Sequence, residues 1–123
     1  MTKPILCLDF DGVLHSYTSG WQGAVIISDP PVPGAIEFLR EAVKHFTVCI
    51  YSTRSNSVDG IYAMKGWLEQ HGAGEPLMDE LHFPDEKPPA FVTLDDRAIT
   101  FDGRWPAIET LLAFKPWFKR EAA

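Results

Sequence analysis

The fold of this chain is decided by PILCLDFDG, residues 4–12, in which an apolar run ends in two aspartates. A short apolar run bounded by Pro on one side and Asp and Gly on the other is typical of a buried parallel strand. Alternation along a strand would direct Asp9 and Asp11 to the same face. Burying two carboxylates is costly unless something neutralises them. The pair therefore suits a divalent cation with one carboxylate left free to react. A turn or capping pair is the alternative, because Asp is a common turn residue.

Strand-like and helix-like segments alternate along the rest of the chain. Continuous apolar or β-rich runs indicate strands, and apolar residues at helical spacing indicate helices. This alternation predicts an α/β fold with a parallel sheet. Residues 13–33 are rich in Gly and Pro and predict a flap over one end of the sheet. We expect helices that open at Pro33-Gly34 and at Pro106 and one over 58–71, and strands at 5–8, 46–51, 81–83 and 91–94.

Length and composition set the class of protein. The 123 residues, 46% of them hydrophobic, suit a single packed domain over residues 1–123. A net charge of −6 disfavours nonspecific attraction to nucleic acid, although a strand end held in a locally positive site stays open. Cys7 and Cys49 fall in apolar strand-like runs and are read as reduced core residues. No apolar run approaches the length of a membrane span, so we expect a cytoplasmic protein without a membrane partner.

Polar side chains follow three of the predicted strands at the point where each strand ends. Asp9 and Asp11 follow the first strand, Ser52 follows the second, and Asp95 and Asp96 follow the last. Ligands of parallel α/β sheets bind at the carboxyl ends of the strands. The sequence therefore predicts four carboxylates and a hydroxyl in one crevice. Oxygen ligands of this kind suit Mg²⁺, whereas the scattered histidines give no zinc pattern.

A Mg²⁺ site with a spare carboxylate indicates phosphoryl transfer through an aspartyl-phosphate. A second carboxylate can protonate the leaving oxygen and then activate water. The remaining phosphate oxygens need a hydroxyl and a lysine, for which Ser52 and Lys87 are the candidates. An ordinary loop serine and a solvated surface lysine are the alternatives. Lys65 is the fallback for Lys87, although it lies within a predicted helix.

Four segments taken together resemble the signature motifs of the haloacid dehalogenase (HAD) superfamily. They are residues 9–13, residues 51–54, Lys87 and residues 94–96, in the order that the family has them. The resemblance implies a Rossmann-like, three-layer α/β/α sandwich with a mainly parallel sheet and a small flap. The segments available for a cap domain are short, so the chain resembles the capless type of phosphatase.

The resemblance also implies roles for individual residues. Asp9 would be the nucleophile, and Asp11 the general acid and base. Mg²⁺ would be held by the Asp9 side chain, the Asp11 backbone carbonyl and the Asp95-Asp96 pair, of which one can act through water or only orient the lysine. Substrate phosphate would be bound by Ser52, Thr53, Arg54 and Lys87.

The expected function is that of a Mg²⁺-dependent phosphomonoesterase acting on a nucleotide or another small phosphomonoester. The alternatives are a 3'-phosphatase that processes nucleic-acid ends and a catalytically silent binding module with the same fold. Arg54 and Arg97 can each read the substrate or simply be solvated. Trp21 can stack on a base or pin the flap to the core, while Trp67, Trp105 and Trp117 are expected to pack. The oligomeric state stays open.

Overall fold

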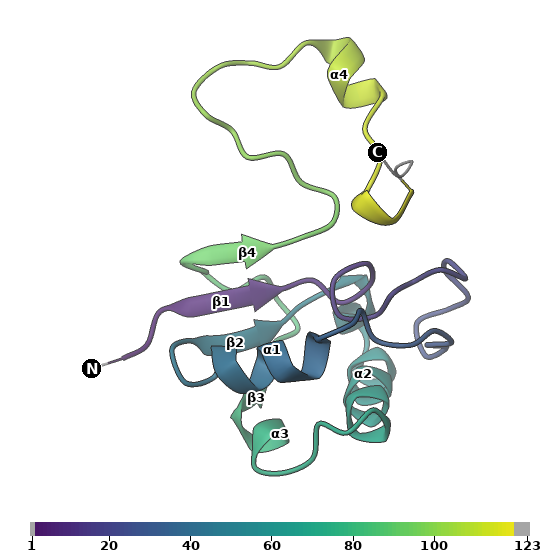
Figure 1. Ribbon diagram of the computed structural model, residues 1–123, viewed down its shortest axis with the longest axis vertical. Helices are drawn as coiled ribbons and strands as arrows, with labels where there is room; N and C mark the ends of the chain where they lie inside the picture. The colour runs from purple at the N-terminus through teal and green to yellow at the C-terminus, as the bar shows by residue number, and fades with distance from the viewer. Residues whose placement is uncertain (1, 120–123) are drawn as a thin grey trace.

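The computed structural model describes residues 2–119 and contains a four-stranded, all-parallel sheet in the order β3-β2-β1-β4 (Figure 1). The predicted α/β class with a parallel sheet is confirmed. The two ends of the predicted domain, residue 1 and residues 120–123, lie outside the described residues. The strands are β1 (Ile5–Leu8), β2 (Thr47–Ile50), β3 (Leu81–His82) and β4 (Val92–Leu94). The helices are α1 (Ala35–Ala42), α2 (Val58–Gln70), α3 (Leu77–Glu80) and α4 (Ile108–Leu112), with 3-10 turns η1 (Thr53–Asn56) and η2 (Trp117–Lys119).

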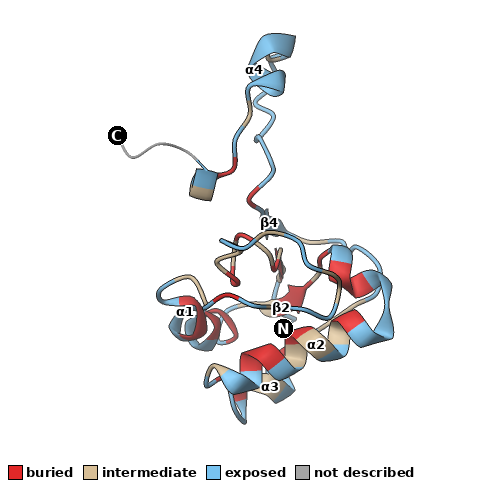
Figure 2. Cartoon of the chain, turned by 90° about the vertical axis from the view of Figure 1, so that its right-hand side faces the viewer, coloured by how far each residue is buried: buried red, intermediate tan, exposed pale blue. Residues whose placement is uncertain are grey.

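The core lies on one face of the sheet. Leu6 and Leu8 of β1 are in register with Val48 and Ile50 of β2, so these four side chains share a face. They belong to one buried cluster with the apolar sides of α1 and α2, which include Leu39 and Leu68. Figure 2 shows the buried residues gathered on these elements. The apolar faces of the two helices therefore pack on the face of the sheet that carries the alternating apolar residues of β1 and β2.

The two cysteines lie next to each other on the other face of the sheet. Cys7 of β1 is in register with Cys49 of β2, and both are buried and free. Burial is the main cause that raises the pKa of each thiol. The predicted burial of both cysteines is confirmed, and their reduced state stays a prediction.

The C-terminal part of the chain packs less than the sequence predicts. All three residues of β4 are exposed, and α4 stands away from the sheet (Figures 1 and 2). The expected packing of Trp105 is wrong, because 87% of this side chain is exposed, and the apolar stripe of α4 is exposed as well. Trp117 is half exposed, whereas Trp67 is buried as predicted. Helix α4 has five residues and is too short to reach back across the sheet. A helical layer on the second face of the sheet, as in the expected three-layer sandwich, therefore stays a prediction.

Several element boundaries differ from the predicted ones for local reasons. Helix α1 begins at Ala35 because Gly34 adopts a left-handed conformation with φ 86°. The last helix begins at Ile108, two residues beyond Pro106, and α3 has no counterpart in the prediction. None of the helices among residues 2–119 is long and apolar enough to cross a bilayer.

Candidate active site

Three aspartates converge at the carboxyl edge of the sheet. Asp9 follows β1 directly, and Asp95 and Asp96 follow β4, the strand that pairs with β1. The backbone N–H of Asp9 donates to the carbonyl of Leu94 at 3.0 Å, which holds the two strand ends together. One carboxylate oxygen from each aspartate lies within 4.8 Å of the others. The predicted gathering of acidic groups from separate motifs is therefore present for these three residues.

The environment of Asp9 disfavours its charge. The pKa of Asp9 is raised to about 8, mainly by burial; the hydrogen bond with Asp96 and the charges of Asp95 and Asp96 also raise it, while the backbone N–H of Phe10 lowers it. Like charges gathered in a partly buried site have this effect when no cation neutralises them. A divalent cation bound among the three carboxylates would restore the ionised form of Asp9, so the donor set fits Mg²⁺.

Gly12 allows the acidic loop to close tightly. Its φ of 80° lies in the left-handed region, and a Cβ placed there would overlap the carboxylate of Asp96 and lie 2.7 Å from a ring carbon of Phe118. The Nε1–H of Trp117 donates to the Gly12 carbonyl at 2.6 Å. The C-terminal turn η2 thus packs directly on the loop that carries Asp9 and Asp11 (Figure 1).

A cavity of about 290 Å³ opens at this edge of the sheet. Ser52 and Thr53 line it together with acidic, aromatic and basic side chains, which are Asp9, Asp11, Tyr17, Trp21, Asp96 and Arg97. Ser52 comes from the end of β2, accepts a hydrogen bond from the backbone N–H of Arg54 at 3.0 Å and caps η1. The hydroxyl therefore has a structural role and still borders the space beside Asp9.

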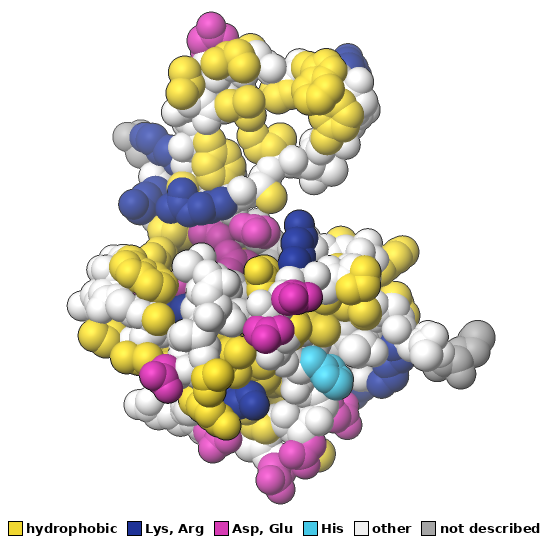
Figure 3. All heavy atoms as spheres, turned by 180° about the vertical axis from the view of Figure 1, so that it is seen from behind, with side chains coloured by type: hydrophobic (Ala, Val, Ile, Leu, Met, Phe, Trp, Pro, Cys, Tyr) yellow, Lys and Arg dark blue, Asp and Glu magenta, His cyan; other side chains and the backbone are white. Residues whose placement is uncertain are grey.

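Lys87 is exposed in the loop between β3 and β4. Burial, Cys49 and Asp9 raise the pKa of the Cys7 thiol, and the charge of Lys87 lowers it by a smaller amount. The lysine therefore lies near the Cys7 face of the sheet, while the cavity is lined by other residues. Residues 97–116, called the C-terminal arm below, lie apart from the sheet and its helices, which form the body. Figure 3 shows an acidic patch between the body and the arm, with basic side chains on both sides of it. The role of Lys87 in phosphate binding stays a prediction.

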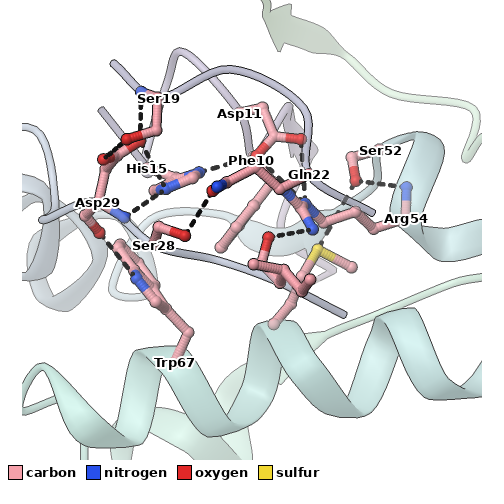
Figure 4. Close-up of polar contacts among 12 residues, drawn as sticks. Phe10, Asp11, His15, Ser19, Gln22, Ser28, Asp29, Ser52, Arg54 and Trp67 are labelled. Carbon is pink, nitrogen blue, oxygen red and sulfur yellow. Dashed lines mark hydrogen bonds and ion pairs between the residues drawn. The ribbon is translucent and has the colours of Figure 1, made fainter. Parts of the chain in front are cut away.

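The Asp11 carboxylate does not belong to the cluster formed by the other three aspartates. Its Oδ1 accepts from Nδ1 of His15 at 2.9 Å, and Nε of Arg54 donates to Oδ1 and Oδ2 at 3.2 and 3.0 Å (Figure 4). The side chain is 14% exposed and lines the cavity. The carboxylate is thus held in a fixed orientation by two donors and still borders the space where a substrate would lie.

Arg54 joins Asp11 to the flap. Its side chain is fully buried, and Nη1 donates to the backbone carbonyls of Gly23, Ala24 and Ile26 at 3.0, 2.8 and 3.2 Å. Trp21 stacks over the guanidinium, which lies 4.9 Å from the ring centroid. Arg54 is therefore not solvated, and substrate binding by it stays a prediction. Trp21 thus contacts Arg54 in the turn that follows β2, and about half of it remains exposed.

His15 extends the same network and was not expected from the sequence. Its Nε2 accepts from the backbone N–H of Asp29 at 3.1 Å, which assigns the proton to Nδ1 facing Asp11. The Asp29 carbonyl accepts from Nε1 of Trp67 on α2 at 3.1 Å. The only signal in the sequence is that His15 follows Asp11 by four residues, which carries no periodic pattern. Asp29 lies before two prolines and reads as a turn residue.

Comparison of the chain with protein-family models, with curated proteins and with solved structures gave no match.

Proposed function

We propose that the chain is a Mg²⁺-dependent phosphohydrolase with a HAD-like fold that acts through an aspartyl-phosphate on Asp9. The observation that carries this proposal is the meeting of Asp9, Asp95 and Asp96 within 4.8 Å at the ends of two paired parallel strands. Capping or turn formation would not require carboxylates from segments that lie more than 80 residues apart to share one site. The adjoining 290 Å³ cavity leaves space for a phosphoryl group.

Asp9 is the nucleophile of the proposed reaction. One of its carboxylate oxygens attacks phosphorus, the bond from phosphorus to the ester oxygen breaks, and the leaving oxygen takes a proton from Asp11. Water then attacks the phosphorus and gives a proton to Asp11, the bond between phosphorus and the Asp9 oxygen breaks, and inorganic phosphate is released. The hydrogen bonds from His15 and Arg54 hold Asp11 in place for both steps.

Mg²⁺ would be held by Asp9, Asp95 and Asp96, with the Asp11 backbone carbonyl as a further oxygen. When bound, the cation neutralises phosphate charge and keeps Asp9 ionised. Ser52 and Thr53 border the cavity and supply hydroxyl groups for phosphate oxygens. Lys87 is the proposed cationic partner of the phosphate.

The first test is hydrolysis of p-nitrophenyl phosphate with Mg²⁺ by the wild-type protein and by Asp9→Asn. We expect turnover to fall on the order of 10³-fold or more, because the nucleophile is lost while the shape of the side chain is kept. Asp79→Asn is the matched control, since Asp79 is exposed on α3. Equal turnover by wild type and Asp9→Asn would contradict the assignment of the nucleophile. Absence of turnover on a broad phosphoester panel would favour the silent binding module.

A second test follows from the raised pKa of Asp9. In chelator, the folded protein keeps a proton on Asp9 that the unfolded chain loses near pH 4, so the free energy of unfolding should fall as pH rises from about 4 to about 8. Asp9→Asn should remove most of this slope. Mg²⁺ should stabilise the wild type, and more at pH 8 than at pH 6, because binding displaces the proton. Urea unfolding at fixed pH measures all three.

A further inference from the structure

A second cavity adjoins the first and is not used by the proposed chemistry. It has a volume of about 450 Å³ and lies between the flap, the loop after β4 and the C-terminal turn η2. Three of its lining residues, Tyr17, Trp21 and Arg97, also line the 290 Å³ cavity beside Asp9. A substrate with its phosphoryl group at Asp9 would therefore extend its leaving group into this space.

Aromatic rings are already in position around the second cavity. The Trp21 ring packs on the Arg54 guanidinium at 4.9 Å and is half exposed. Tyr17 and Phe118 meet edge to face with ring centroids 6.0 Å apart. Tyr17 has φ 61°, a left-handed conformation that a bulky residue rarely adopts and that recurs at functional sites. These rings form a site for a flat group, because fixed aromatic faces bind nucleobases by stacking.

Basic side chains complete the lining. Arg97 follows Asp96, and Lys119 ends η2; both side chains are exposed and both line the second cavity. None of the ion pairs between residues 2 and 119 involves either of them. The chain carries a net charge of −6, so two cations beside an aromatic cavity are a local departure from the overall charge. They suit an anionic group in addition to the phosphate that reacts at Asp9.

We propose that the second cavity binds the leaving group of the substrate, and that this group is a nucleotide whose base stacks against Trp21 while a further phosphate contacts Arg97 and Lys119. This inference rests on the proposed function only for the position of the reacting phosphate. The volume lies in the range of small-molecule sites. Both a free nucleoside bisphosphate and the phosphorylated end of a nucleic-acid strand carry this chemistry.

Binding without turnover tests the inference. Asp9→Asn protein with Mg²⁺ is titrated by calorimetry with adenosine 3',5'-bisphosphate and with glycerol 2-phosphate, which has no ring. We expect the bisphosphate to bind at least tenfold more tightly, and adding Trp21→Ala to reduce its affinity about tenfold. Trp21→Phe should retain most of the affinity because it keeps a stacking face. Trp105→Ala is the matched control, since Trp105 is exposed in the arm.

The basic side of the second cavity is tested separately with Lys119→Gln. Because Lys119 lies outside the flap, this variant still tests the proposal if Trp21→Ala fails to fold. This change should weaken the bisphosphate several-fold more than adenosine 3'-monophosphate, whereas the exposed Lys44→Gln should affect neither. Equal affinity for the bisphosphate and glycerol 2-phosphate, or no effect of Trp21→Ala and Lys119→Gln in folded protein, would overturn the proposal.

Two further results identify the source of the nucleotide and separate this inference from the proposed hydrolase. If a short 3'-phosphorylated oligonucleotide binds more than tenfold more tightly than the bisphosphate, the natural ligand is a strand end. If the oligonucleotide binds less tightly than that, the natural ligand is a free nucleotide. Bisphosphate binding that depends on Trp21, in a protein that hydrolyses no phosphoester, would contradict the hydrolase and support the cavity. Hydrolysis without any preference for a ring would do the reverse.

Discussion

The flap, residues 13–33, and the C-terminal arm, residues 97–116, are both largely irregular segments that leave the carboxyl edge of the sheet, yet they are held in opposite ways. The flap is fixed by a few buried polar side chains: Arg54 reaches its backbone from the body, and His15 of the flap itself accepts from the backbone of Asp29. The arm is rich in apolar side chains that stay exposed, such as Leu112. Apolar composition alone therefore does not make a segment pack, whereas a handful of satisfied hydrogen bonds can fix one that has no regular structure.

The arm encloses its own space instead of covering the sheet. Its side chains surround a hollow of about 640 Å³, which Figure 3 shows as an opening among apolar residues. Contact with the body is made just beyond its end, by η2, where Nε1–H of Trp117 donates to the Gly12 carbonyl. The arm is thus tied to the acidic loop at its end while its middle is unsupported.

The largest effect is expected for Arg54→Met, which breaks the attachment of the flap. The change leaves Asp11 and three flap carbonyls without their buried donor, so we expect a loss of about 3 to 5 kcal/mol in the free energy of unfolding. Arg104→Met in the arm is the matched control and should change stability by less than about 0.5 kcal/mol. Urea denaturation measures both. A small loss for Arg54→Met would mean that the flap is held by something other than this guanidinium.

A matched pair of leucines sharpens the contrast between body and arm. Leu68→Ala on α2 removes a fully buried side chain and should cost about 2 to 5 kcal/mol. Leu112→Ala on α4 removes one that is 82% exposed and should stay within about 0.5 kcal/mol. Thermal or urea unfolding gives both values. A large loss for Leu112→Ala would show that the arm packs in solution more than it does here.

The smallest effect is expected for Ser19→Ala in the flap, whose cost in stability should depend on pH. The hydroxyl and the backbone N–H of Ser19 both donate to the Asp29 carboxylate, and these bonds lower the pKa of Asp29 below 3.8. Their contribution is therefore present above about pH 4 and lost as the pH falls through the lowered value. Ser19→Ala should cost about 1 kcal/mol at pH 7 and less at pH 3. Ser19→Ala should also be cleaved faster by protease within the flap than the wild type. Thr100→Ala in the arm should change neither the free energy of unfolding nor the rate of cleavage.

The sequence predicts the sheet and the acidic cluster for the same physical reason. Apolar runs that end in Asp9, Ser52 and Asp95 locate both the strands and their carboxyl ends, and parallel pairing then brings those ends together. The Gly12 turn is also visible, because a glycine beside two aspartates marks a sharp change of direction.

The contacts between the flap and the body were not predictable in this way. Arg54 was expected at a substrate or in solvent, and it lies in a cage of flap carbonyls that no periodic pattern encodes. His15 and Asp29 meet only through the path of an irregular loop. The apolar stripe of α4 was predicted to pack because periodicity reports an amphipathic face and says nothing of what covers it. Trp105 was expected to pack as a large aromatic residue, but its size likewise does not supply a partner surface.

The strand order β3-β2-β1-β4 has a consequence for the order in which the molecule can be assembled during synthesis. Strand β1 leaves the ribosome first and pairs with β2 as soon as about fifty residues are available. Its other edge stays open until β4, residues 92–94, has been made. The contact that brings Asp95 and Asp96 to Asp9 is thus among the longest-range in the chain and, by its loop-closure entropy, among the slowest to form. A nascent chain would carry a folded half-sheet with an exposed edge before it carries a complete acidic site.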